Sequence, residues 1–320
     1  MNEFDFIRRY LLKKIKAVDT ILGIGDDAAI IRPQIDYDIH ISSDLLLENR
    51  HFFKNTAPED LAHKVLAVNL SDMAAMGATP RWVLLSVALP ELEEQWLKRF
   101  CDSFFALADQ FNVEVIGGDT TKGALTFNVT ILGQTPRGKA LKRDAAEVGD
   151  DIWVTGSLGL AAAALDHIWQ KVVLPDAVFQ ECEQARLRPN PRVDFGKKLL
   201  TVAHAAQDIS DGFAQDLSHI LKASNVGACV WYEKVPTHPF LTQLTDNAQW
   251  PLNGGDDYEL VFTAAPEQKD MIENMAQQTG TQVSRVGQIE TQLGLRIFKQ
   301  NNQPFYLHSL GFDHFDSDEN

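Results

Sequence analysis

Aspartates next to glycine or serine recur along this chain in five short groups that could bind a metal ion. The groups are LGIGDDAAII at 22–31, HISSD at 40–44, VIGGD at 115–119, QDISDG at 207–212 and NGGDD at 253–257. Each acid follows an apolar, strand-like run where glycine or serine predicts a turn, and α/β folds place their sites in such loops. A surface turn is the alternative for any one group, since Gly and Asp both favour turns. Five groups of one design favour a shared carboxylate cluster.

Asp72 differs from these acids because it lies inside an apolar helical pattern, LAHKVLAVNLSDMAAMG. It is the one charged residue between Lys64 and Arg81, and Asn69, three residues earlier, shares its helix face. A buried carboxylate without a partner costs several kcal/mol or becomes neutral, and a cation beside it removes that cost. The alternative is a hydrogen bond from Asp72 to nearby backbone.

Converging carboxylates need cations, since two unit charges about 4 Å apart repel by roughly 4 kcal/mol at an effective dielectric constant near 20. Hard divalent cations prefer oxygen ligands, and Mg²⁺ best accompanies phosphates. The chain has no DxDxDG calcium loop, its nine histidines are scattered and its three cysteines form no CxxC pair, so zinc is not expected. The net charge of −15 disfavours nucleic-acid binding. A polyanionic substrate therefore needs metal ions or a local basic patch.

One basic patch is present in RGKALKR, residues 137–143. Its cations, Arg137, Lys139, Lys142 and Arg143, could contact phosphates. The overlapping GQTPRGKA resembles a P-loop, but Ala140 replaces the Ser or Thr that would bind Mg²⁺, so we do not expect one. A solvated linker is the alternative for this segment.

The elements that position these residues form two halves. Thr56, Pro58 and Glu59 predict a helix start, and the helix should end at Gly77. The other patterns predict strands at 37–42, 82–88 and 125–133, a long helix at 92–111 and, in the second half, strands at 151–155 and 228–235. The polar, basic segment 134–150 predicts domains at 1–138 and 149–320, joined by a linker at 139–148. Alternating strands and helices favour an α/β or α+β protein.

The remaining composition points to a protein of a reducing compartment. Three cysteines in 320 residues, no signal-peptide pattern and no apolar run of 18 residues favour a cytoplasmic protein without a membrane span.

The motifs together resemble a known family. LGIGDDAAII, ISSD, HF, AVNLSDMAAMGATP, VIGGDTT, DISDG and GGDDYEL recur in order, as in the thiamine-monophosphate kinases of the aminoimidazole-ribonucleotide-synthetase-like ATP-binding superfamily. The resemblance runs from about residue 20 to GFDHF at 311–315. It implies an N-terminal α+β domain that pairs with its copy in a homodimer and closes a β-barrel across the interface. It also implies a C-terminal α/β domain, with the active site between the two.

The resemblance also implies site residues. The Mg²⁺ ligands, direct or through water, would be Asp27, Ser42, Ser43, Asp44, Asp72, Asp119, Asp208 and Asp211. ATP would contact Gly118, Asp119, Arg143 and Ser210, and thiamine phosphate would contact His51, Asp256 and Phe312. The family more often has Glu at 256 and Tyr or Trp at 312. A Phe face can still stack on a cationic ring.

The implied reaction is ATP-dependent phosphorylation of thiamine monophosphate to thiamine diphosphate, by in-line transfer assisted by several Mg²⁺ ions. The acceptor phosphate is already an anion, so no general base is expected. The transfer would depend on metal held by Asp27, Asp44, Asp72, Asp119 and Asp208. Two alternatives stay open: a superfamily enzyme with another acceptor, and a regulator that binds nucleotide and metal without turnover.

Overall fold

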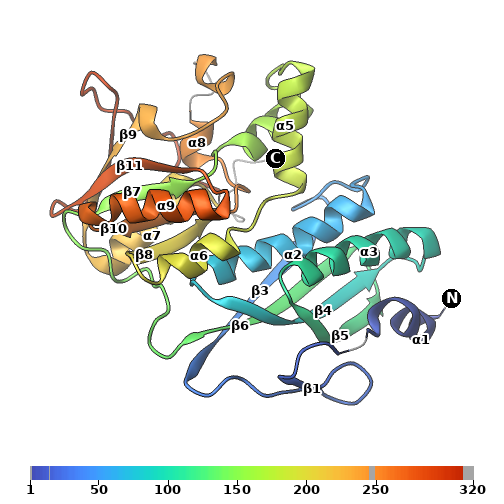
Figure 1. The fold of residues 1–320 in the computed structure, drawn as a ribbon. Helices are drawn as coiled ribbons and strands as arrows, with labels where there is room; N and C mark the ends of the chain where they lie inside the picture. Colours follow the sequence, from blue (N-terminus) through green and yellow to red (C-terminus); the bar gives the residue numbers. More distant parts are fainter. Residues whose placement is uncertain (1, 14, 245–248, 313–320) are drawn as a thin grey trace. The chain divides into compact units, whose positions relative to one another are not determined.

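The computed structural model describes residues 2–13, 15–244 and 249–312 in two compact units (Figure 1). The first unit comprises Met1–Met73 and Ala78–Ala140, and the second comprises Ala74–Gly77 and Leu141–Asn320. The chain thus passes between the units three times. The domain limits and linker that the sequence predicts stay a prediction.

A four-stranded sheet forms the centre of the first unit. Its strands, in spatial order, are β3 (Tyr37–Leu47), β6 (Thr126–Pro136), β4 (Thr79–Leu89) and β5 (Glu114–Lys122). The β4–β5 pair is parallel, and β6 runs antiparallel to both β3 and β4. Within the described residues this sheet is open, with β3 and β5 as its edges. The barrel across a dimer interface therefore stays a prediction.

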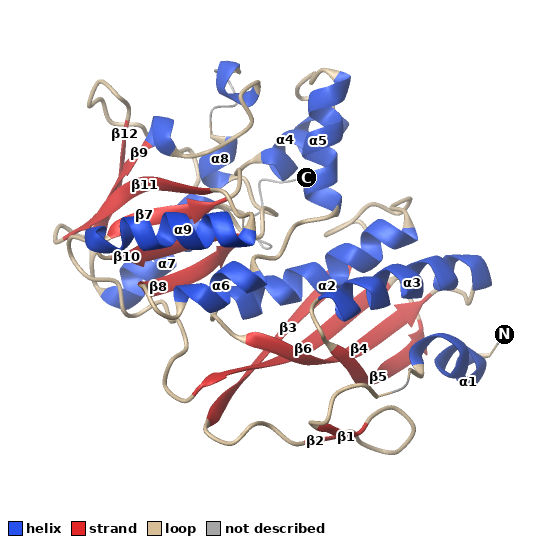
Figure 2. Ribbon diagram, viewed as in Figure 1, coloured by secondary structure: helices blue, strands red, loops and turns tan. Residues whose placement is uncertain are grey.

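Two helices, α2 (Pro58–Ala75) and α3 (Glu94–Gln110), cover one face of this sheet (Figure 2). Their apolar residues are buried together with Trp82, Phe127 and Ile131 of the strands. The N-terminal amphipathic segment forms a short α1 (Glu3–Phe6) and a π-helical turn, η1 (Ile7–Leu11). The short strands β1 (Thr20–Leu22) and β2 (Ile30–Ile31) pair with each other.

The second unit contains a six-stranded sheet. Its strands, in spatial order, are β12 (Gly294–Phe298), β9 (Gly227–Trp231), β11 (Val283–Glu290), β7 (Asp151–Thr155), β10 (Glu259–Ala264) and β8 (Ala203–Ile209). Of the pairs in this described sheet, β12–β9 is parallel and the other four are antiparallel. Alternation of strands and helices along the sequence has thus produced a largely antiparallel sheet.

Successive side chains of a strand point to opposite faces of a sheet, and in β7 and β10 the side chains on both faces are buried. Val154 and Val261, which are paired, belong to a core with Leu217 of α7 (Phe213–Ser224). Their neighbours Trp153 and Phe262, also paired, lie on the other face, where Phe262 contacts Phe195 of α6 (Val193–Leu199) with ring centroids 5.8 Å apart. Both helices are short and amphipathic, and each buries its apolar side on the sheet.

The second unit contains further helices, of which α9 (Lys269–Thr279) lies beside α6 on the same face of the sheet (Figure 1). The others are α4 (Leu160–Ile168), α5 (Asp176–Leu187), α8 (Trp250–Asn253) and the 3₁₀ turns η2 (Tyr232–Lys234), η3 (Leu241–Gln243) and η5 (Pro266–Gln268). Ala163, Cys182 and Trp250 form a second, smaller core among them. No helix in the described part of the chain has both the length and the apolar character needed to cross a membrane.

Candidate functional site

Predicted site residues of the first unit meet where β3 passes α2. Ser42 and Asp44 share a strand face with the buried Leu46. The Ser42 hydroxyl donates to Asp72 Oδ2 at 2.5 Å, and the Asp44 backbone N–H donates to Asn69 Oδ1 at 3.3 Å. Asn69 and Asp72 thus project from one face of α2 toward one strand, as their spacing predicts. We call Ser42, Asp44, Asn69 and Asp72 the first-unit cluster.

The first-unit cluster carries two carboxylates at close range. Burial raises the pKa of Asp44 to about 7, and the negative charge of Asp72 adds to that rise. A cation between them would relieve both effects. The donors are all oxygens, which fits Mg²⁺, an ion commonly held by one or two carboxylates plus substrate phosphates. The described residues contain no group of three or more His, Cys, Asp or Glu side chains placed to hold a metal.

Asp44 makes the folding stability of the metal-free protein depend on pH. Folding raises its pKa from 3.8 to about 7, so the folded state holds this proton more tightly than the unfolded state does. The resulting stabilisation is complete below the unfolded pKa and is lost as the pH rises through the folded pKa. We expect the melting temperature in chelator to fall by at least about 2–4 °C as the pH rises from about 4 to about 7, the interval between the unfolded and folded pKa values. Calorimetry of Asp44→Asn should show a smaller fall, and an equal fall would assign the effect to other groups.

Asp119 lies at the opposite edge of the sheet from Asp44. The register pairs Asp44 with Val129, Val129 with Leu85, and Leu85 with Gly118, three strand spacings away. That separation is about 14 Å, so one Mg²⁺ with ligands at about 2.1 Å cannot join the two acids within one chain. Both acids also lie inside strands, so the interpretation that they follow strand ends was wrong. Pairing continues past each of them, which local sequence does not reveal.

Gly118 has a packing reason for its identity. Its φ is 146°, and a Cβ at this position would lie 1.8 Å from the Leu85 carbonyl oxygen. Only glycine lets β5 approach β4 this closely. Its predicted contact with ATP stays a prediction.

Three other predicted residues of the first unit lie elsewhere. The Ser43 side chain points to the opposite strand face from Ser42, where its hydroxyl lies 3.0 Å from Thr130 Oγ1. Asp27 is exposed in the loop between β1 and β2, and its backbone N–H donates to the Asp26 side chain at 2.9 Å. His51 Nδ1 accepts the Leu47 backbone N–H at 3.0 Å in the turn after β3. The paired aspartates at 26–27 therefore form an exposed turn in this structure.

Five predicted residues of the second unit meet in one loop cluster. Asp208 is 7% exposed near the end of β8, and Ser210 and Asp211 follow in the next turn. The Asp256 backbone N–H donates to the Ser210 carbonyl at 2.7 Å, and the Phe312 N–H donates to the Asp211 carbonyl at 2.9 Å. Segments far apart in sequence are thus joined by main-chain bonds. We call Asp208, Ser210, Asp211, Asp256 and Phe312 the second-unit cluster.

Arg143 shares a neighbour with the second-unit cluster. The pKa of His219 on α7 is lowered by burial and by the positive charge of Arg143, whereas the charge of Asp211 raises it. Arg143 and Asp211 therefore act on the same imidazole. The Arg143 side chain is exposed, and its carbonyl accepts the Ser224 hydroxyl at 2.8 Å. An exposed guanidinium in this position is free to meet a phosphate.

Asp216, a buried residue in the first turn of α7, was not among the site residues predicted from the sequence. One oxygen of its carboxylate accepts the backbone N–H groups of Ser210, Asp211 and Gly212 at 3.0, 3.0 and 3.2 Å. Burial raises its pKa to about 7, although these N–H groups favour the charged form. The signal was an acid in the first turn of the helix that follows QDISDG, where free N–H groups and the positive end of the helix dipole favour a carboxylate.

Asp257, the second acid of NGGDD, was also missed as a structural residue. Both of its carboxylate oxygens accept the Gly159 N–H, at 2.9 and 3.0 Å, where α4 begins. Desolvation on burial raises its pKa well above the ordinary value. The adjacent acids 256 and 257 therefore differ in role, since Asp257 occupies the start of a helix within the fold.

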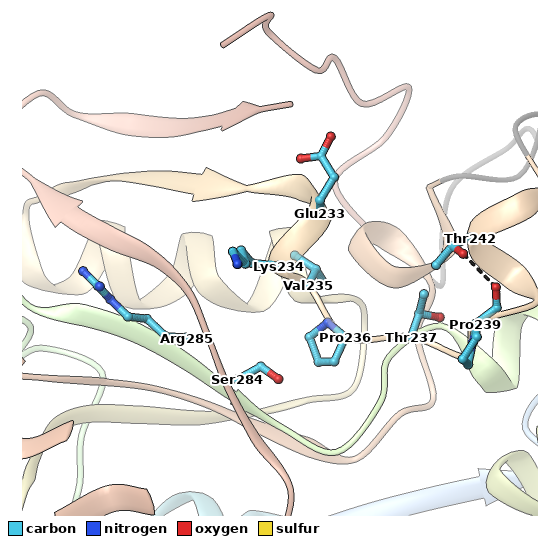
Figure 3. A pocket seen from close by; sticks show the side chains of 9 residues that line it. All are labelled: Glu233, Lys234, Val235, Pro236, Thr237, Pro239, Thr242, Ser284 and Arg285. Carbon is cyan, nitrogen blue, oxygen red and sulfur yellow. Dashed lines mark hydrogen bonds between the residues drawn. The ribbon is translucent and has the colours of Figure 1, made fainter. Parts of the chain in front are cut away.

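A pocket of about 550 Å³ lies elsewhere in the second unit (Figure 3). It is lined by Glu233, Lys234, Val235, Pro236, Thr237, Pro239, Thr242, Ser284 and Arg285. It contains no predicted site residue. The Arg285 guanidinium is already paired with Asp151 at 2.6 Å and stands over the Trp231 ring. This pocket therefore adds nothing to the two clusters.

The comparisons with known proteins agree with the motifs. Residues 25–135 match the family described as AIR synthase related protein, N-terminal domain, and residues 147–299 match its C-terminal domain. The thiamine-monophosphate kinase of Haemophilus influenzae is 41% identical, over 98% of each chain, and that of Escherichia coli K12 is 39% identical over the same share. The crystal structure of thiamine-monophosphate kinase from Stenotrophomonas maltophilia is 44% identical, with a TM-score of 0.84 over 92% of this chain and 94% of that one.

A second solved structure is AaThiL complexed with AMPPCP and TMP. It is 29% identical, with a TM-score of 0.77 over 91% of this chain and 92% of that one. Similarity at these levels extends over nearly the whole length of the relatives, so it covers both units of the fold. The chain belongs to the thiamine-monophosphate kinase family of enzymes.

Proposed function

We propose that the protein transfers the terminal phosphoryl group of ATP to thiamine monophosphate, giving thiamine diphosphate and ADP. The observation that carries this proposal is the second-unit cluster, which joins residues implied for metal, nucleotide and substrate through main-chain bonds. Relatives of this length and identity bear the name of this activity, and AaThiL has been solved with AMPPCP and TMP. The two proposed substrates correspond to those ligands.

The proposed transfer is direct and in line. The acceptor oxygen belongs to a phosphate that is an anion at neutral pH, so no side chain has to deprotonate it. Positioning and charge neutralisation then supply most of the rate enhancement. When bound, several Mg²⁺ ions would neutralise and bridge the phosphates of both substrates. Asp44 and Asp72 are the carboxylates best placed to hold such an ion, since one already raises the pKa of the other.

The other residues receive narrower proposed roles. Asp208, Asp211 and Asp119 would hold further ions, with Asp27 and the two serines as direct or water-mediated ligands. Arg143, Ser210 and Gly118 would contact ATP, and His51, Asp256 and Phe312 would contact thiamine monophosphate. The Phe312 ring offers a face to the cationic thiazolium. We propose a cytoplasmic location, which the three free cysteines support.

A coupled assay of ADP release tests the proposed function. ADP release that requires both thiamine monophosphate and Mg²⁺ is the expected result. Release driven by another phosphorylated acceptor would favour a different superfamily enzyme. Binding of ATP without release of ADP under any acceptor would favour the regulator.

We also propose that the protein is a homodimer joined through the first units. The β3 face turned away from α2 and α3 is apolar and open to solvent: Ile41 is 67% exposed and Leu45 is 51% exposed. Tyr37, Ile39 and Leu47 of the same strand face are exposed as well. A strand edge and face of this kind favour pairing with another sheet.

Sedimentation equilibrium at micromolar concentration should give twice the 35.7 kDa of one chain. Replacing Ile41 with Lys should shift the protein toward monomer, since a charge would then lie in the apolar face. Ile35, which is 89% exposed outside β3, provides the matched control, and Ile35→Lys should leave the mass unchanged. A wild-type mass near 35.7 kDa at rising concentration would rule out the dimer and the barrel with it.

A further inference from the structure

Asp216 is not among the residues implied to contact metal, nucleotide or substrate, yet its carboxylate holds the turn that carries two of them. Oδ2 accepts the N–H groups of Ser210, Asp211 and Gly212, at 3.0, 3.0 and 3.2 Å. Oδ1 accepts Gln207 Nε2 at 2.7 Å. The side chain of Asp216 is 1% exposed, so water does not compete for these bonds.

The backbone of the turn is shaped for this contact. Gly212 has a φ of 126°, and a Cβ there would lie 2.9 Å from the carbonyl carbon of Asn253. This conformation aims three consecutive N–H groups at one point, an arrangement that binds anions in other proteins. Here the anion is the protein's own Asp216. Without it the three groups would lose their shared acceptor, and the turn would be free to move.

The same peptide groups also position the substrate side of the second-unit cluster. The carbonyls of Ser210 and Asp211 accept the backbone N–H groups of Asp256 and Phe312. Asp216 therefore fixes Ser210 and Asp211 through the N–H groups of these two residues. The carbonyls of the same two residues in turn hold the backbone of Asp256 and Phe312. A displacement of the turn would move the proposed metal, nucleotide and substrate contacts together.

We propose that Asp216 is a positioning residue, which fixes the Ser210–Gly212 turn for phosphoryl transfer by accepting its three N–H groups. The inference rests on the proposed function. It requires an acceptor atom at this place and does not require a negative charge.

The substitution Asp216→Asn separates these two requirements. Its amide oxygen can still accept the three N–H groups. Gln207 Oε1 is buried and has no hydrogen-bond partner among the described residues, so a rotated Gln207 amide can accept the new NH₂ group. Asp216→Asn therefore preserves the turn, whereas Asp216→Ala removes its acceptor.

Asp150 provides the matched control in the second unit. It is 3% exposed, accepts the Glu147 N–H at 2.9 Å and lies 2.9 Å from His204 Nδ1. Asp150→Ala thus removes a buried carboxylate with a comparable set of bonds, far along the chain from the turn. It should lower the melting temperature without affecting the reaction.

Three readouts on the full chain test the proposal: kcat, the Mg²⁺ concentration that gives half-maximal rate, and hydrogen exchange of the peptide covering residues 208–213. For Asp216→Ala we expect a loss of kcat of about 100-fold, the cost of a misplacement of about 1 Å. The half-maximal Mg²⁺ concentration should rise at least about 10-fold, and the peptide should exchange faster. Asp216→Asn should stay within about fivefold of wild type in all three, and Asp150→Ala should match wild type.

Unchanged kcat and Mg²⁺ dependence in a folded Asp216→Ala protein would overturn the proposal. So would Asp216→Asn behaving like Asp216→Ala, because the charge itself would then be needed. If Asp216→Ala does not fold, Asp216→Asn decides the proposal: kcat and exchange within about fivefold of wild type support it, and a larger loss overturns it. A wild-type protein without turnover would reject the proposed function instead, and the exchange measurement would still decide whether Asp216 holds the turn.

Discussion

Replacing Asp72 with Asn should lower turnover at least 100-fold while the protein stays folded. Such a loss corresponds to about 2.7 kcal/mol of transition-state stabilisation. Asp72 lies beside Asp44, and the substitution removes one of the two negative charges that would hold a cation there. The fold should survive because the Asn side chain can still accept the Ser42 hydroxyl. The metal-free variant should melt at the same temperature as wild type or higher, since repulsion of Asp44 is relieved and its pKa falls. Coupled kinetics and calorimetry in chelator give the two measurements.

Asp102→Asn is the control for this variant. Asp102 is an exposed acid of α3 in the same unit, and its carboxylate pairs with Lys98 at 2.5 Å. Removing its charge should leave turnover unchanged. Normal turnover in Asp72→Asn would reduce Asp72 to a hydrogen-bonded residue of the fold.

Removing divalent metal should abolish turnover and lower the affinity for ATP at least 10-fold, equal to about 1.4 kcal/mol. The chain carries a net charge of −15, and the first-unit cluster adds two close carboxylates, so the bare triphosphate meets mostly negative charge. Calorimetric titration of ATP with Mg²⁺, and again with excess chelator at matched ionic strength, measures the effect.

The double variant Asp44→Asn, Asp72→Asn should show a smaller effect of metal removal on ATP affinity. It should bind ATP in chelator more tightly than wild type does, because two negative charges are gone, and it should gain less from Mg²⁺. Equal ATP affinity of the wild-type protein with and without metal would contradict a metal bridge between these acids and the nucleotide.

Helix ends were the most predictable part of the fold, because local residues determine them. Thr56, Pro58 and Glu59 indicated the start of α2, and its end before Gly77 follows from a φ of 66° that favours glycine. Strand ends were less predictable. The alternation at 37–42 suggested a short strand, but β3 continues to Leu47 because all eleven residues pair with β6. Such pairing depends on residues about 90 positions away, which no local pattern contains.

The same contrast applies to the site. The three-residue spacing of Asn69 and Asp72 correctly placed both on one helix face, because helix geometry is local. Spacing could not reveal that Asp44 and Asp119 lie at opposite edges of a sheet. It also could not assign different partners to Asp256 and Asp257, since the buried Gly159 N–H that binds Asp257 comes from a turn about 100 residues earlier.

The three crossings between the two units bear on how the chain folds as it is made. Ala74–Gly77 belong to the second unit, where Met76 accepts the Leu141 N–H and a Cβ on Gly196 would lie 2.2 Å from the Ala74 carbonyl oxygen. Gly196 leaves the ribosome about 120 residues after Gly77, a delay on the order of 10 s at typical synthesis rates. The last turn of α2 must wait that long for its packing partners. A nascent chain that stops near residue 140 would present this apolar turn to chaperones, and neither unit can be released as a finished body by a single cleavage of the chain.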